Sequence, residues 1–181
     1  AKKRKIVNIS NAKVPENIDC NIRFENVEFS YDSSIRLFKD LNIDIPFGSS
    51  VGIVGDTGSG KTTIAKLLLR LYEADNGSII MGDHKITDLD IKFLREKIGI
   101  VSQEPFLFNS SIRENICYGL KGSSLEEIES AAKESQIWEF IEQLPEGIDT
   151  IIGERGQNLS GGQRQRIAIA RTLMRKPEVI I

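Results

Sequence analysis

Gly55-Asp56-Thr57-Gly58-Ser59-Gly60-Lys61-Thr62 is the stretch that decides the fold of this 181-residue chain. Residues 51–54 before it form a continuous apolar run, which is typical of a strand buried on both faces. Residues 62–71 after it carry apolar side chains at helical spacing, so a core-facing helix is predicted there. The order strand, glycine-rich loop and helix is the context in which this motif predicts phosphate binding.

The residue types in the loop suit the phosphates of a nucleotide. Glycines let successive backbone N–H groups converge on phosphate oxygens, and the N-terminus of the helix adds a partial positive charge. Lys61 would reach the β- and γ-phosphates, which gives it a catalytic role, and the Thr62 hydroxyl would bind Mg²⁺. The predicted contacts to the nucleotide are Gly55, Asp56, Thr57, Gly58, Ser59, Gly60, Lys61, Thr62 and Thr63. The loop alone does not choose between ATP and GTP, and a plain Gly/Ser turn is the alternative that its context disfavours.

A second glycine motif, Leu159-Ser160-Gly161-Gly162-Gln163, begins another predicted helix, over residues 160–175. Ser160 suits the N-cap position, which is the simplest interpretation of the motif. Two adjacent glycines after the cap each cost about 1 kcal/mol relative to alanine inside a helix, so capping does not explain them. Close approach of this backbone to an anion would explain the two glycines.

The two motifs together resemble the nucleotide-binding domain of an ATP-binding cassette (ABC) transporter, over almost the whole chain. Residues 159–163 match the signature motif of that family, and Val101-Ser102-Gln103-Glu104-Pro105 resembles its glutamine loop. Tyr31 falls where the family places an aromatic ring that stacks on adenine; taken alone, it would be filler in the core or at a sheet edge. The resemblance implies ATP and Mg²⁺ as cofactors.

Two further segments resemble exporters of the multidrug-resistance-like B subfamily, in which half-transporters pair. Gly153-Glu154-Arg155-Gly156 looks like the segment that exporters use to touch their transmembrane helices, and residues 106–116 have the same character. The resemblance implies export of an unidentified substrate, powered by ATP hydrolysis, through a membrane domain in the same parent chain. It places this domain on the cytosolic or organelle-matrix side of a membrane, with no nucleic acid partner.

The resemblance also implies a site that two copies share. A head-to-tail dimer with a second nucleotide-binding domain, most simply a homodimer, would enclose ATP between the Lys61 loop of one copy and the signature of the other. The contacts made in trans would come from Ser160, Gly161, Gly162 and Gln163. Gln103, to which we also assign a catalytic role, would join Thr62 at Mg²⁺.

The implied fold class is α/β: a P-loop ATPase core with a mostly parallel sheet, an N-terminal antiparallel β subdomain and an inserted α-helical subdomain. We expect residues 1–20 to be a linker from a membrane domain, residues 21–181 to be the ABC domain, and the helical insert to span about residues 105–175. Alternation with one change of phase predicts a bulged strand over residues 22–31.

The family follows the apolar run at residues 179–181 with an acidic pair, an Asp for Mg²⁺ and a Glu for the attacking water. Neither lies within the sequence, so the sequence reads as a domain truncated at its C-terminus. We expect this chain alone to hydrolyse ATP poorly.

The composition limits the alternatives. A net charge of −2 gives no overall basic field for nucleic acid, and Cys20 and Cys117 have neither the spacing of a zinc site nor that of a disulfide framework. An importer subunit, a soluble ABC-type ATPase acting on nucleic acid, and a regulatory module without catalysis remain open alternatives.

Overall fold

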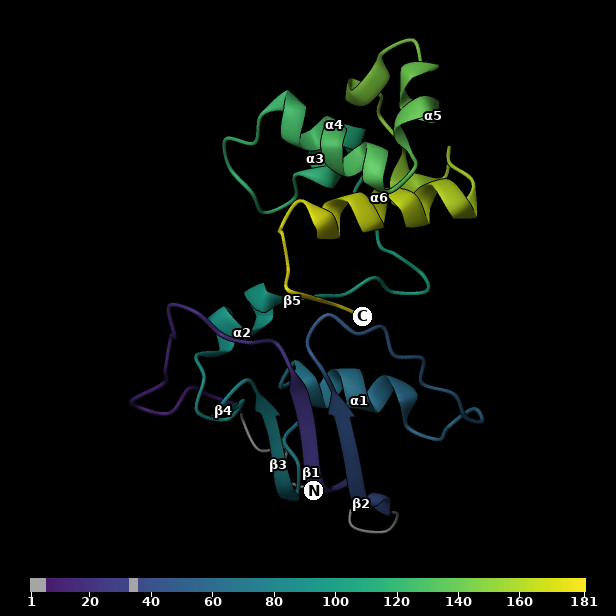
Figure 1. Cartoon of the computed structure of the whole chain (residues 1–181). Coiled ribbons are helices and arrows are strands. Elements are labelled where there is room, and N and C mark those ends of the chain that lie inside the picture. The colour runs from purple at the N-terminus through teal and green to yellow at the C-terminus, as the bar shows by residue number, and fades with distance from the viewer. Residues whose placement is uncertain (1–5, 33–35) are drawn as a thin grey trace. The chain divides into compact units, whose positions relative to one another are not determined.

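The structure is a computed structural model that describes residues 6–32 and 36–181. Residues 1–5, which belong to the predicted linker, lie outside the described residues. The chain forms two compact units, residues 1–96 and residues 97–181. Each unit has its own sheet and helices (Figure 1).

The first unit is built on a four-stranded antiparallel sheet. Its order is β2 (Arg36–Ile45), β1 (Ile22–Ser30), β3 (Asn76–Met81) and β4 (His84–Lys85), so β1 is central (Figure 1). The register between β1 and β2 shifts between Phe24 and Val27, and both of these side chains are buried. The bulge is therefore where the change of phase in the sequence predicted it, and the N-terminal antiparallel sheet is confirmed.

Two helices complete the first unit. Helix α1 (Lys61–Leu68) buries Ile64, Leu67 and Leu68, as its helical spacing predicted, but it ends three residues before the expected end at residue 71. The chain leaves the helix at Arg70, whose φ of 49° is left-handed and not helical. Helix α2 (Ile91–Lys97) begins after Asp90, which accepts a hydrogen bond from Phe93 N through Oδ1 at 2.9 Å.

The second unit consists mainly of short helices around one core. They are α3 (Ile112–Ile116), α4 (Leu125–Glu134), α5 (Trp138–Glu142), α6 (Gly161–Leu173) and the 3₁₀ turns η1 (Gly147–Asp149) and η2 (Glu154–Gly156). Capping boxes at Ser111 and Ser124 fix the starts of α3 and α4. The helices pack α6 against α3 and α4 around fully buried side chains such as Ile112, Ile116 and Ile167.

The parallel sheet is much smaller than the expected one. The described residues contain one parallel sheet, the two-stranded pair of β5 (Ile98–Gly99) and β6 (Val179–Ile180). The mixed α/β class is therefore correct, whereas the mostly parallel sheet is not seen.

The run at residues 51–54, predicted to be a buried strand, is not a strand in the structure, and Val54 is 96% exposed. The physical reason is that a strand needs a neighbour for its N–H and C=O groups, and no strand within residues 6–32 and 36–96 pairs with this run. Among the described residues, none of the helices has the length and apolar character needed to cross a membrane.

Candidate functional site

The loop at residues 55–60 places a set of unpaired donors at the start of α1. Within the described residues, the backbone N–H groups of Gly58, Gly60, Lys61 and Thr62 make no hydrogen bond. Lys61 Nζ folds back over the loop and donates to Gly55 O at 2.6 Å and to Gly55's neighbour, Asp56 O, at 2.7 Å. Unpaired N–H groups at the positive end of a helix dipole suit an anion.

Gly60 is required by the packing of the first unit. Its φ is 99°, and a Cβ atom there would lie 2.6 Å from Cζ of the buried Phe38 ring. An L side chain at this position would meet both backbone strain and a clash. Phe38 thus holds the loop at the N-terminus of α1.

Tyr31 lies beside α1. Its hydroxyl and Thr63 Oγ1 are 2.9 Å apart, and its ring packs edge-on against Phe29 and Tyr72. The Tyr31 side chain is still 48% exposed, so part of the ring is free to contact a ligand. Thr63 itself is buried and its hydroxyl already bonds Tyr31, which suits a role in placing the ring.

These groups fit ATP with Mg²⁺. The unpaired N–H groups and Lys61 suit a chain of phosphates, the exposed Thr62 hydroxyl suits a cation bound to those phosphates, and Tyr31 offers a flat apolar face for a base. All of them belong to the first unit.

The N-terminus of α6 is a second site of this kind, in the second unit. Ser160 and Gln163 form a capping box: Ser160 Oγ accepts from Gln163 N at 3.2 Å, and Gln163 Oε1 accepts from Ser160 N at 2.8 Å. Because Ser160 Oγ accepts from the helix, its hydrogen is free to donate outward. The N–H groups of Gly161 and Gly162 make no hydrogen bond within the described residues.

The glycine pair of α6 is not required by the fold of this chain. A Cβ at Gly162 would meet nothing within 4 Å, and one at Gly161 would meet only Arg164 Nη2, at 3.8 Å. Both residues have ordinary helical φ, so neither is needed for a turn. The open space beside Gly162 and the unpaired N–H groups of both glycines suit an approaching anion.

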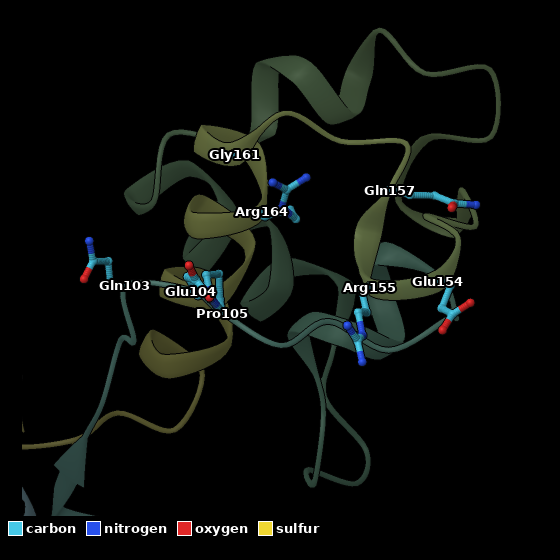
Figure 2. Close-up of a pocket in the computed structure, with 8 residues that line it drawn as sticks. All are labelled: Gln103, Glu104, Pro105, Glu154, Arg155, Gln157, Gly161 and Arg164. Atoms are coloured by element: carbon cyan, nitrogen blue, oxygen red, sulfur yellow. The ribbon is translucent and has the colours of Figure 1, made fainter.

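Gln103 lies in the second unit, in a groove of about 570 Å³ that also reaches the start of α6 (Figure 2). One wall is the segment Gln103, Glu104 and Pro105; the other residues that line it are Glu154, Arg155, Gln157, Gly161 and Arg164. The structure thus brings Gln103 and Gly161 to one groove. It keeps Tyr31 and the Lys61 loop in the other unit.

Sequence reasoning missed Arg164, which lines this groove. A usable signal was present: Arg164 follows the motif directly, in the first turn of a helix, where a positive charge is unfavourable next to the positive end of the helix dipole. An arginine at that position needs acceptors to hold it.

Comparisons with known proteins agree with this geometry. A family model described as ABC transporter matches residues 38–181. The chain is 51% identical over 162 residues to the ABC multidrug transporter mdr2 of Aspergillus fumigatus, covering 88% of this chain and 20% of that protein. It is 45% identical over 183 residues to the ATP-binding cassette sub-family B member 5 of Homo sapiens, covering 99% of this chain and 15% of that protein.

Among solved structures, a bacterial Atm1-family ABC exporter with ATP bound matches with a TM-score of 0.92 and 42% identity, over 97% of this chain and 31% of that one. The chain therefore spans about a third or less of the length of these relatives.

Proposed function

This chain belongs to the ABC transporter family, and from this premise we propose that it is the ATP-binding domain of a B-family exporter, where it drives the export of a substrate across a membrane. The single observation that carries the proposal is the pair of helix N-termini with unpaired donors, at Lys61 and at Gly161. Each suits phosphate, and neither is closed off by its own unit.

The first unit would hold most of the nucleotide. The N–H groups of residues 58–62 and Lys61 would bind the phosphates, and Lys61 would exchange its two carbonyl partners for phosphate oxygens. Tyr31 would lie against the adenine ring. Mg²⁺, when bound, would neutralise charge on the phosphates, and Thr62 and Gln103 are the residues that we assign to it.

The signature at residues 160–163 would act on the ATP of a second copy. Ser160 would donate its hydroxyl hydrogen, and Gly161 and Gly162 their N–H groups, to the terminal phosphate. Gln163 would keep Ser160 in place through the capping box. Because these donors attract the phosphate only while it is present, a head-to-tail dimer would close with ATP and open after hydrolysis.

The relatives support a proposal about the wider assembly. We propose a membrane domain in the same parent chain, with this domain on the cytosolic or matrix side, and a second nucleotide-binding domain as partner. The exporter function rests on the names of the similar proteins, which include a multidrug transporter and an Atm1-family exporter. The transported substrate would be chosen by the membrane domain.

The test distinguishes the roles of the Lys61 loop and of the signature at residues 160–163. Lys61→Ala is expected to weaken ATP binding to the single chain more than about tenfold, since it removes the cation aimed at the phosphates. Ser160→Ala is expected to leave that affinity unchanged and to weaken ATP-driven self-association. Fluorescence titration with an ATP analogue gives the first quantity, and sedimentation velocity gives the second.

Ser124→Ala is the matched control, because Ser124 caps α4 with the same type of capping box and lies outside the proposed site. Both serine variants lose about 1 kcal/mol of stability from the cap. Equal effects of Ser160→Ala and Ser124→Ala on association would reject the two-copy site. Unchanged ATP affinity in Lys61→Ala would reject nucleotide binding at the loop.

A further inference from the structure

Arg164 joins two segments of the second unit that border the same groove. Its Nη1 atom donates to Leu159 O at 2.6 Å and lies 3.5 Å from Gly156 O. Leu159 directly precedes the signature serine, and Gly156 ends the turn η2. One guanidinium thus contacts the backbone on both sides of the link between η2 and α6, at the wall of the groove (Figure 2).

The aliphatic part of the Arg164 side chain packs over Gly156, which has no side chain. Gly156 has a φ of 69°, and a Cβ there would lie 3.3 Å from both Cγ and Cδ of Arg164. Gly156 O also accepts from Leu159 N at 3.0 Å, which closes the short loop between η2 and α6. The aliphatic part of Arg164 therefore fills the space over Gly156 while its guanidinium reaches the carbonyls.

The electrostatics indicate that the hydrogen bonds of Arg164 hold the backbone in position. A cation in the first turn of a helix is unfavourable, because that end of the dipole is positive. No ion pair compensates Arg164 within residues 6–32 and 36–181. Its acceptors are main-chain carbonyls, so its hydrogen bonds fix backbone and do not neutralise charge.

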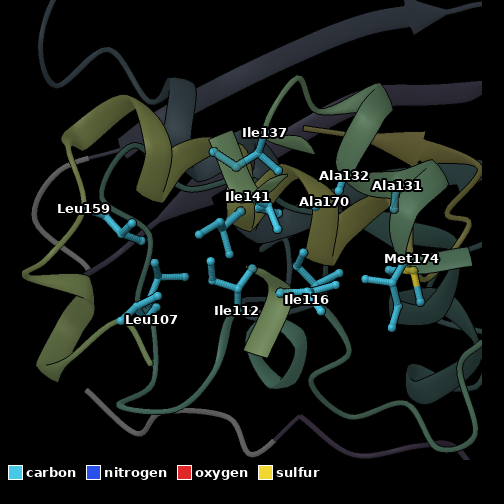
Figure 3. Close-up of a cluster of buried hydrophobic side chains, with 14 residues drawn as sticks. Leu107, Ile112, Ile116, Ala131, Ala132, Ile137, Ile141, Leu159, Ala170 and Met174 are labelled. Carbon is cyan, nitrogen blue, oxygen red and sulfur yellow. The ribbon is translucent and has the colours of Figure 1, made fainter. Parts of the chain in front are cut away.

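The carbonyl that Arg164 holds most tightly belongs to an anchored residue. Leu159 is 7% exposed and packs in the helical core, near Leu107 (Figure 3). A Cβ at Gly156 would lie 3.0 Å from Leu107 Cδ1, so η2 touches the same side chain. Arg164 thus completes a rigid connection from η2 through Leu159 to the donors of Gly161 and Gly162.

We propose that Arg164 is a positioning residue that fixes the unpaired donors of Gly161 and Gly162 relative to the turn η2. This role deepens the proposed function and rests on it, since the signature acts on the ATP of a second copy.

Three variants test the role: Arg164→Ala, Arg164→Lys, and Arg166→Ala as the matched control. Arg166 is exposed on the same helix and makes none of these contacts, so its variant removes the same charge without the connection. The first readout is hydrogen exchange of the hydrogen-bonded amides within residues 157–163, with α4 as the internal reference; these amides are Gln157, Asn158, Leu159, Ser160 and Gln163. Arg164→Ala is expected to speed this exchange about tenfold, which is the loss of one hydrogen bond to a charged group.

The second readout is ATP-driven association of the chain, beside ATP affinity of the single chain. Arg164→Ala is expected to weaken association about tenfold with ATP affinity unchanged. Arg164→Lys should recover part of both losses, because an ammonium group can still donate to Leu159 O but not reach both carbonyls. Arg166→Ala should behave as the native chain.

If the amides within residues 157–163 of Arg164→Ala exchanged at the rate of the native chain, the proposal would be overturned. An equal increase in the exchange rate in α4 would overturn it too, because that result indicates a general loss of stability. Absence of ATP-driven association in the native chain would count against the shared site and not against Arg164, whose role the exchange readout still decides.

Discussion

Replacing Gly162 with alanine is expected to raise stability and lower function. The new Cβ would meet no heavy atom within 4 Å, and the residue already has helical φ and ψ within α6. Glycine in a helix is less stable than alanine by about 0.5–1 kcal/mol, because it loses more backbone freedom on folding. A gain of about 0.5 kcal/mol is therefore expected, since Gly162 lies in the first turn, and urea unfolding measures it.

The expected loss of function concerns the binding of a second copy of the chain with its ATP. The methyl group of Gly162→Ala would occupy the space through which a phosphate approaches the N–H groups of Gly161 and Gly162. ATP-driven self-association is therefore expected to fall by more than about tenfold, while ATP affinity of the single chain stays unchanged. Sedimentation velocity with and without ATP measures the first, and an equilibrium titration measures the second.

Gly156→Ala is the contrasting variant in the same unit. At Gly156 φ is +69°, and the new Cβ would lie 3.0 Å from Leu107 Cδ1. Left-handed backbone costs an L residue about 1–2 kcal/mol, so this variant should lose stability. A loss of stability in Gly162→Ala, or ATP-driven association of that variant equal to that of the native chain, would contradict these expectations.

Two further predictions concern the second unit. Asn115→Ala should lower the stability of this unit by about 3 kcal/mol in urea unfolding. The reason is that Asn115 Oδ1 accepts from Phe108 N and Arg171 Nη2, and both donors would lose a partner. The control is Asn109→Ala, which should change stability little because Asn109 is exposed. Hydrogen bonds from Arg113 hold the pKa of Asp149 below its usual value, so the stability from this pair is complete above about pH 4 and is lost as pH falls through the lowered pKa. Asp149→Asn should flatten that acid limb of a pH series of thermal unfolding, and an unchanged limb would contradict it.

The local parts of the site followed from the sequence. The two glycine motifs, the helix after each and the N-cap at Ser160 are all present. So is the bulge after Phe24, which the alternation of apolar residues marks. These features depend on φ preferences, caps and side-chain spacing within a few residues, and such short-range properties can be recognised along the chain.

The strand predicted at residues 51–54 did not form. Residues 51–54 have the composition of a buried strand, yet Val54 is almost fully exposed, whereas residues 98–99 do form a strand with β6. An apolar run shows only that a segment suits burial. Whether it becomes a strand depends on a partner far away in sequence, here 81 residues away for Ile98 and Val179.

The sequence by itself determined that this protein has two helices that begin at glycine-rich motifs, because glycines and caps act locally. Tertiary structure alone decided which contacts hold those starts in place. Thr63 bonds Tyr31 across 32 residues, Phe38 closes the space at Gly60, and Arg164 folds back on Gly156. The contacts of Tyr31 and Phe38 arise only once folding brings distant parts of the chain together, so no local pattern encodes them. Arg164 and Gly156 are only eight residues apart, and there the positive charge in the first turn of the helix was a local signal.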